Sequence, residues 1–225
     1  MRILIINPNS DDAFSADMQA CARQFADGRF EVDACSVPTA PKFLVTEYDK
    51  SLCVPGMVQI IQQQEARYDA FIIAAFGDPA LHMLREITVR PVLGIGECSM
   101  KLASMLGASF SILTFYPRSY AMLKEQVEQN GMGRYLASIR ALEQDRPELA
   151  YDERFYDIGY RAVHEDLAEV LILGCGGLTN GVDRALSERL HVPVLDSLIC
   201  ALIVASGMAQ YGLQTSKAGR YQNGY

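Results

Sequence analysis

The sequence predicts an α/β protein of two pseudosymmetric domains, each a parallel sheet of roughly four strands flanked by helices. Short apolar runs alternate with helical segments along 225 residues, of which 50% are hydrophobic. Residues 71–105 and 170–206 also match each other, since both contain an apolar strand, a glycine turn, a helix, a Pro-Val strand and a second helix. This internal repeat indicates two related halves, whose strand-end loops we expect to face each other across a cleft.

The first half begins the alternation of strands and helices. Asn7-Pro8-Asn9-Ser10 has the composition of a turn after the first strand, and Asn9 or Ser10 is suited to cap the next helix. An apolar loop over residues 40–51 either lines a pocket or packs on the core. Pro79 is suited to the first position of the helix after the third strand. The expected strands are 2–6, 30–37, 68–75 and 89–95, and the expected helices include 12–26 and 55–67.

The second half repeats this pattern after a helix over residues 99–106. Asn130-Gly131 is a usual left-handed stop for the helix that precedes it. The sequence predicts a first domain over 1–95 with 207–225 and a second over 96–206. The expected strands are 109–114, 135–142, 171–173 and one around Val192-Pro193-Val194; the expected helices are 118–129, 153–167, 180–189 and 197–212, before a polar tail.

Composition excludes several classes of partner. The net charge is −7 and no basic stripe is present, which argues against nucleic acid and anionic membranes. The amino terminus lacks a signal-peptide pattern, and the longest apolar run, 198–205, is too short to span a membrane. Six cysteines without CxxC pairs or neighbouring histidines suggest neither disulfides nor zinc. We expect a cytoplasmic homo-oligomer with a small-molecule substrate and no metal.

A cysteine flanked by glycines is the strongest candidate for chemistry. Cys175 follows the apolar run 171–173 and precedes a helical segment, so its thiol is predicted at a strand end and a helix start. A helix dipole there lowers a thiol pKa toward that of a reactive thiolate. The alternative is that Cys175 is a small buried hydrophobe. The repeat makes Ala75 its counterpart in the first half.

Seven segments resemble one enzyme family in the family's order over nearly the whole chain: INPNS, FGDPAL, PVLGIGE, RYLASIRA, LGCGGL, VPVLDS and LQTSKAGRY. The chain resembles the hydantoin and allantoin racemases of the aspartate/glutamate racemase superfamily. The resemblance implies a cofactor-independent enzyme in which one cysteine from each domain flanks the substrate. One thiolate removes the α-proton and the other thiol returns a proton to the opposite face.

The resemblance also assigns site residues. Cys175 matches the second cysteine, whereas Ala75 stands where the family has its first. Backbone N–H groups after Asn9, Gly77 and Gly176 are expected to stabilise the enolate oxygen. The expected substrate-binding residues are Asn9, Ser10, Phe43, Val45, Phe76, Gly77, Asp78, Thr114, Gly176 and Gly177.

Two departures from the family pattern bear on the substrate and the activity. Residues 43–49 read FLVTEYD where hydantoin racemases resemble SIESxYD, so Val45 makes that wall of the pocket more apolar. Ala75 is either an introduced inactivating change, a natural feature as in the single-cysteine arylmalonate decarboxylases, or a sign that catalysis was lost and binding kept. We favour the racemase scaffold because RYLASIRA and the tail resemble hydantoin racemases more closely than they resemble decarboxylases.

The remaining polar candidates are weaker. Cys98 follows Gly96-Glu97 and could replace the missing thiol, but buried packing is the favoured interpretation. The three histidines, His82, His164 and His191, form no sequence cluster and suit surface or capping roles. Asp196-Ser197 mirrors Glu97 and is expected to cap the last helix, although a strand-end position also permits a role in the cleft.

Overall fold

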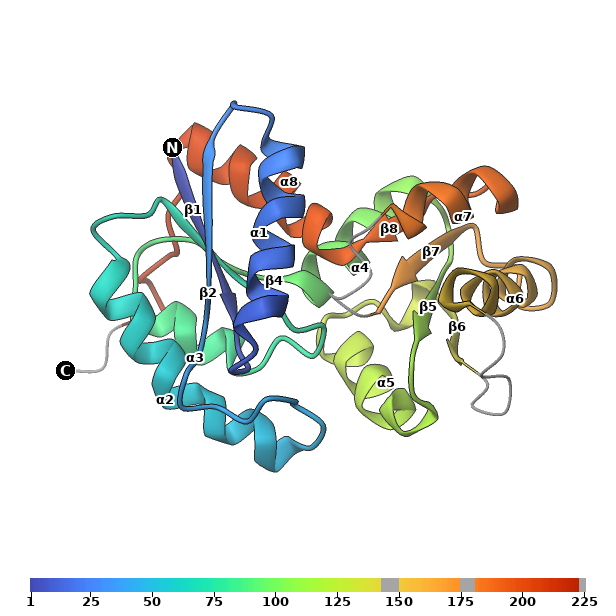
Figure 1. Ribbon diagram of the computed structural model, residues 1–225, viewed down its shortest axis with the longest axis horizontal. Helices are drawn as coiled ribbons and strands as arrows, with labels where there is room; N and C mark the ends of the chain where they lie inside the picture. The colour runs from blue at the N-terminus through green and yellow to red at the C-terminus, as the bar shows by residue number, and fades with distance from the viewer. Residues whose placement is uncertain (143–149, 175–180, 223–225) are drawn as a thin grey trace. The chain divides into compact units, whose positions relative to one another are not determined.

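The computed structural model in Figure 1 describes residues 1–142, 150–174 and 181–222. The chain divides into two compact units, one of Met1–Ile95 with Ala201–Tyr225 and one of Gly96–Cys200. The second passage between units falls at residue 200, inside the helix α8 (Ser197–Tyr211), whereas the sequence predicts it at residue 206. Within the described ranges, no helix combines the length and the apolar character that crossing a bilayer requires.

The first unit is built on a parallel sheet with the strand order β2-β1-β3-β4. Both faces of its central strand β1 are buried, with Ile3 and Ile5 fully buried and Leu4 only 4% exposed. Burial on both faces explains why the strand is a continuous apolar run. The elements are β1 (Arg2–Asn7), β2 (Glu31–Ser36), β3 (Ala70–Ile73), β4 (Val92–Gly94), α1 (Asp12–Ala26), α2 (Glu47–Gln64) and α3 (Leu81–Glu86).

The second unit repeats the topology with the strand order β6-β5-β7-β8, again all parallel. Phe155 is fully buried in its core and meets Phe115 edge to face, with ring centroids 5.1 Å apart. The predicted fold class of two similar four-stranded α/β domains is confirmed over the described residues. The elements are α4 (Ile95–Leu106), β5 (Phe110–Thr114), α5 (Tyr120–Gln129), β6 (Leu136–Ala141), α6 (Tyr151–His164), β7 (Val170–Leu173), α7 (Val182–Leu190) and β8 (Val194–Asp196).

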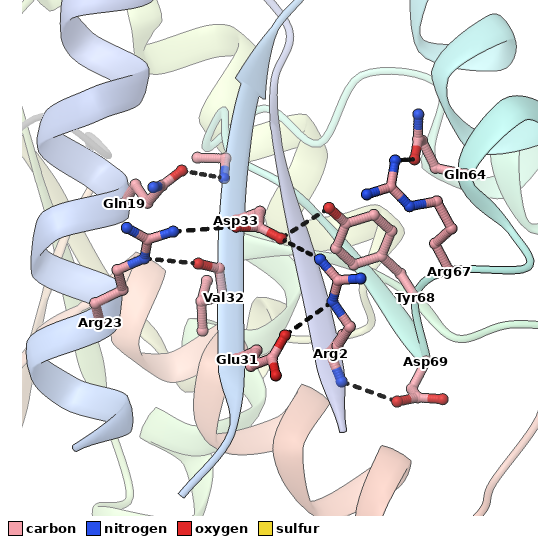
Figure 2. Close-up of polar contacts among 11 residues, drawn as sticks. Arg2, Gln19, Arg23, Glu31, Val32, Asp33, Gln64, Arg67, Tyr68 and Asp69 are labelled. Carbon is pink, nitrogen blue, oxygen red and sulfur yellow. Dashed lines mark hydrogen bonds and ion pairs between the residues drawn. The ribbon is translucent and has the colours of Figure 1, made fainter. Parts of the chain in front are cut away.

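An ionic cluster ties the first unit together toward the amino end of β1 (Figure 2). Asp33 of β2 accepts hydrogen bonds from Tyr68 Oη at 2.8 Å, Arg2 at 3.0 Å and Arg23 at 3.1 Å. Burial opposes the charge on Asp33, but these three donors outweigh it and lower the pKa of the carboxyl group. The cluster therefore joins β1, β2, α1 and the start of β3 on the side remote from the strand carboxyl ends.

The second helix begins eight residues before the predicted start at Pro55. Thr46 accepts a hydrogen bond from the Asp49 N–H at 3.1 Å, and Asp49 accepts from the Thr46 N–H at 2.8 Å. This capping box starts α2 at Glu47, inside the predicted loop 40–51. Pro55 lies within the helix and does not begin it.

The cap of α1 and the start of α3 also differ from the sequence prediction in the first unit. The cap of α1 is Asp11, which accepts from the Phe14 N–H at 3.1 Å, and is neither Asn9 nor Ser10. After β3, α3 begins at Leu81, because Ala80 has a left-handed backbone with φ 56° and cannot continue a helix. Pro79 therefore lies in the preceding turn.

The fourth strand is shorter than predicted. Glu65 accepts from Thr88 Oγ1 at 2.6 Å and from the Val89 N–H at 3.1 Å, which fixes residues 88–91 as a turn. The strand occupies only Val92–Gly94, and α4 follows at once from Ile95, four residues before the predicted start. In the second unit, a 3₁₀ turn over Pro117–Ser119 precedes α5, and the predicted stop is confirmed by Gly131 at φ 70°.

Candidate active site

The loop after β1 is held by a network of amide hydrogen bonds. Asn7 is 1% exposed, and its Nδ2 donates to Asn9 Oδ1 at 2.7 Å and to Ser15 Oγ at 3.0 Å. Asn9 Oδ1 also accepts from the Asp11 N–H at 2.9 Å. The side-chain oxygen of Asn9 therefore accepts two hydrogen bonds. Its Nδ2 has no hydrogen-bond partner among the described residues. A half-buried amide donor is thus presented at the carboxyl end of β1.

The loop after β2 packs beside this first loop. The Val37 N–H donates to Asn9 O at 2.8 Å, and the Ser10 N–H donates to Pro41 O at 3.2 Å. The structure therefore brings Asn9 and Ser10 next to the segment that carries Phe43 and Val45. Those two side chains are 68% and 41% exposed, whereas Ala40 of the same loop is buried in the core and Leu44 packs against it, so the loop is only partly exposed to solvent.

The ends of β3 and β7 occupy the same position in their two sheets. The Ala74 N–H donates to Ile6 O of β1 at 2.9 Å, and the Gly174 N–H donates to Leu113 O of β5 at 2.8 Å. Ile6 pairs with Ile73, just as Leu113 pairs with Leu173. Ala75 and residue 175 are therefore each one residue beyond equivalent points, as the internal repeat predicts.

A tight turn follows Ala75 at the end of β3. The Asp78 N–H donates to Ala75 O at 2.9 Å, and Asp78 itself has φ 44°. Its carboxyl group lies over Gly94, because a Cβ built on Gly94 would lie 2.2 Å from Asp78 Cγ. Gly94 therefore provides the space that the Asp78 carboxyl group fills. Sequence reasoning missed this role of Gly94, because residues 78 and 94 meet only through the pairing of β3 with β4.

The backbone donors at these strand ends differ from those predicted. The N–H after Asn9 donates to Pro41 O in the loop after β2, and the N–H after Gly77 donates to Ala75 O within its own turn, so neither donor is available. Among the described residues, the N–H groups of Ala75 and Gly77 have no hydrogen-bond partner. Ala75 and Gly77 are partly exposed, whereas Phe76 is only 6% exposed. The available donors thus belong to the same turn but to different residues.

The fit of Asp78 over Gly94 gives a direct prediction. Gly94→Ala should lower the free energy of unfolding by about 1–3 kcal/mol, because the new methyl group overlaps the Asp78 carboxyl group. Chemical denaturation measures the change. Gly207→Ala in α8 is the matched control, since its added methyl group meets nothing within 4 Å. Equal stability of Gly94→Ala and the parent chain would contradict the placement of Asp78.

In the second unit, the carboxyl ends of β5 and β8 carry polar residues. Thr114, the last residue of β5, is 5% exposed, and its hydroxyl group bonds to no other described residue. Ser197 Oγ donates to Leu173 O at 2.6 Å, which joins the end of β8 to the end of β7. Cys175, Gly176 and Gly177 lie outside the described residues.

Asp196 is confirmed as the cap of α8. Its Oδ1 accepts from the Leu198 N–H at 2.8 Å and from the Ile199 N–H at 3.1 Å. The predicted correspondence with Glu97 is wrong, because Asp196 pairs with Leu173 as Gly94 pairs with Ile73. Asp196 is therefore the counterpart of Gly94, the residue that Asp78 covers in the first unit.

Comparison with known proteins assigns the family. The family model for Asp/Glu/Hydantoin racemase matches residues 3–205. The chain belongs to the Asp/Glu/hydantoin racemase family. It is 37% identical to a hydantoin racemase of Pseudomonas sp. (strain NS671), over 99% of this chain and 91% of that protein. It is 36% identical to a hydantoin racemase of Paenarthrobacter aurescens, over 99% and 97%.

Solved structures agree with this family assignment. The allantoin racemase from Klebsiella pneumoniae superposes with a TM-score of 0.91 at 30% identity, covering 100% of this chain and 94% of that one. Arylmalonate decarboxylase superposes with a TM-score of 0.67 at 17% identity, covering 98% and 97%. At that identity, the second likeness shows a shared fold and nothing about activity. The chain is thus a member of a racemase family by sequence and by structure.

Within this racemase scaffold, three other thiols have surroundings that disfavour a thiolate. Burial raises the pKa of Cys35 and of Cys53 to about 11. Burial, followed by the charges of Asp196 and Asp183, raises the pKa of Cys200 to about 12. Cys98 is 3% exposed, which agrees with its interpretation as a packing residue.

The histidines of this racemase-family chain serve separate structural purposes. His191 ends α7 in a left-handed conformation with φ 58°. His164 is the last residue of α6, with its ring centroid 4.1 Å from that of Tyr160. His82 lies on α3 and contacts Tyr221 of the tail. Among the described residues, no group of three or more His, Cys, Asp or Glu side chains has the arrangement of a metal site.

The buried cap Asp196 makes stability depend on pH. Burial raises its pKa from 3.8 to about 6, against the two backbone N–H donors. The folded state therefore holds a proton that the unfolded state releases between these pH values, so stability falls as pH rises from 4 to 6. Asp196→Asn keeps an acceptor for the helix and should stabilise the protein by about 2 kcal/mol at pH 7.

Thermal unfolding between pH 4 and pH 8 tests this expectation. The advantage of Asp196→Asn should vanish near pH 4, where the carboxyl group of the folded parent is protonated. Asp17→Asn on the exposed part of α1 is the control for a general loss of negative charge. A variant that is less stable than the parent at pH 7 and equal to it at pH 4 would contradict the raised pKa of Asp196.

Proposed function

We propose that this protein is a cofactor-independent racemase scaffold for hydantoin-type substrates, in which Ala75 stands at the position of one of two acid–base thiols. The observation that carries the proposal is the equivalence of the β3 and β7 ends. One of them leads to Ala75 and the other to Cys175. The hydantoin and allantoin racemases among its relatives support the substrate class.

The reaction requires one group for each face of the α-carbon. A thiolate takes the α-proton, and the electron pair of the broken C–H bond moves onto the neighbouring carbonyl oxygen as an enolate. A thiol on the opposite face then delivers its proton to the same carbon, which inverts the centre and leaves a thiolate. We assign one of these roles to Cys175. The other falls to residue 75, where a methyl group can neither take nor give a proton.

The donors at the end of β3 suit the enolate. The N–H groups of Ala75 and Gly77 and the side-chain Nδ2 of Asn9 have no hydrogen-bond partners among the described residues, so they can stabilise a developing oxyanion without breaking an internal bond. A hydantoin ring also offers two N–H groups and two carbonyl groups for pairing with loop backbone. Phe43 and Val45 add exposed apolar surface for a ring substituent.

A panel of substrates tests the proposal on the chain as written. Each enantiomer of allantoin and of 5-substituted hydantoins is incubated in D₂O, and loss of the α-proton signal is followed by proton NMR. We expect exchange for hydantoin-type compounds and no release of CO₂ from a disubstituted malonate. Release of CO₂ without hydantoin exchange would establish an arylmalonate-type decarboxylase instead. Binding of these compounds without either reaction would establish a non-catalytic binder.

A further inference from the structure

The polar tail after α8 is hydrogen-bonded to α3 and to the turn that follows it. Lys217 Nζ donates to Arg85 O and to Glu86 O, both at 2.8 Å. Thr215 donates from its N–H to Val89 O at 2.8 Å and from its hydroxyl group to Arg90 O at 3.0 Å. These four bonds end on backbone carbonyl groups at the two ends of the segment 85–90.

A fifth contact joins the tail to the start of α3. Tyr221 Oη lies 2.7 Å from His82 Nδ1, and the two rings stack with centroids 6.0 Å apart and an interplanar angle of 17°. The tail therefore contacts α3 at both ends. These residues belong to the segment LQTSKAGRY, which the chemistry of the strand-end loops leaves without a function.

The helix α3 has little stability of its own. It has six residues, and its N-cap Ala80 offers no side-chain hydrogen bond. The preceding turn contains two non-glycine residues with positive φ, Asp78 at 44° and Ala80 at 56°. Such conformations persist only where the surrounding structure holds them. At the other end, the Lys217 ammonium group satisfies two carbonyls that a helix terminus leaves without partners.

A chain of turns connects α3 to the proposed acid–base position. Ala75 O accepts from the Asp78 N–H, Asp78 O accepts from the Leu81 N–H at 3.3 Å, and Ala80 O accepts from the Leu84 N–H at 2.9 Å. The helix thus begins immediately where the turn ends. A shift of α3 along its axis would move residues 75–78 with it.

We propose that the tail is a positioning element of the active site, in which Lys217 and Tyr221 hold α3 and thereby keep residue 75 and its neighbouring N–H donors in place. This inference rests on the proposed function for its catalytic consequence. The physical part, that the tail immobilises the turn over residues 74–80, stands on contacts within the first unit alone. Lys217 and Tyr221 are positioning residues, because they act through α3.

Hydrogen–deuterium exchange on the otherwise native chain tests the physical part. Lys217→Met removes the ammonium donors, and we expect about tenfold faster amide exchange in peptides covering residues 74–86. Lys217→Arg keeps a cationic donor and should recover much of the protection. Tyr221→Phe retains the stacked ring but loses the hydroxyl group, so it should give a smaller increase. Lys124→Met is the control, since Lys124 is exposed on α5 and has no hydrogen bond or ion pair within the described residues.

Steady-state racemisation in the Ala75→Cys background tests the catalytic part. Lys217→Met should lower kcat about tenfold with KM changed less than twofold, because misplaced acid–base groups slow the chemical step more than they weaken binding. Faster exchange spread evenly over the chain would reduce the tail to general stabilisation and overturn the inference. Unchanged local exchange, or an unchanged kcat despite faster local exchange, would overturn it as well. If the background variant has no activity, the proposed function fails, while the exchange data still decide whether the tail holds the turn.

Discussion

Ala75→Cys is expected to raise the rate of hydantoin racemisation by about 10²–10⁴-fold over the chain as written. The substitution adds one thiol at the point equivalent to Cys175, at the end of β3. Two thiols can then serve the two faces of the α-carbon, whereas the parent chain has only one. Polarimetry or chiral chromatography of a single hydantoin enantiomer measures the gain.

Ala75→Ser is the matched control for this gain. A hydroxyl group has nearly the size of a thiol but does not ionise near neutral pH, so it should leave the rate close to that of the parent. Circular dichroism of both variants establishes that the fold is kept. A gain with serine equal to that with cysteine would show that added polarity, and not a second thiol, is responsible. No gain with cysteine on any hydantoin would contradict the assignment of position 75.

Cys175→Ser is expected to lower α-proton exchange by the chain as written by at least about 10²-fold. Three other cysteines are poor substitutes, since burial raises the pKa of Cys35, Cys53 and Cys200 well above neutral pH. The measurement is the initial rate of deuterium incorporation at pH 7–8. The rate should fall because the substitution removes the one group at the proposed site that can accept the α-proton.

Cys98→Ser is the control for the Cys175→Ser experiment. Cys98 is buried, and its conversion to serine should leave exchange within about threefold of the parent rate. Circular dichroism again monitors folding. If Cys98→Ser abolishes exchange while Cys175→Ser does not, the acid–base role belongs to Cys98 and not to Cys175.

The layout of the sheets follows from the sequence because apolar runs buried on both faces are easy to recognise. Strands such as 171–173 and the helix 12–26 need only local periodicity and a cap. The start of α2 was obscured because Pro55 is a common first helical residue, whereas the Thr46/Asp49 capping box is a shorter signal. Pro79 likewise favours the first position of a helix in the sequence. The helix begins later because Ala80 is left-handed, and that conformation depends on the tertiary setting of its turn.

The active-site positions follow from the sequence to a more limited extent. The repeat correctly aligns the strand ends at Ala74 and Gly174, one residue before Ala75 and Cys175 in the sequence, because strand order and register are equal in the two units. Which N–H groups remain available does not follow from the sequence, because it depends on the carbonyl group that each one meets: the Ser10 N–H bonds to the loop after β2, and the Asp78 N–H closes its own turn. The space that Gly94 provides for Asp78 and the contact of Lys217 with α3 join residues distant in sequence. Only three-dimensional structure reveals such pairs.

The stereochemistry of deuterium exchange tests the central claim most directly, that one thiol remains of a pair. Each hydantoin enantiomer is incubated separately in D₂O with the chain as written and with Ala75→Cys, beside an enzyme-free sample. The chain as written should place deuterium into one enantiomer with its configuration retained, because Cys175 can act on one face only. The Ala75→Cys variant should place deuterium into the inverted product. Equal exchange of both enantiomers with inversion by the chain as written would contradict the account.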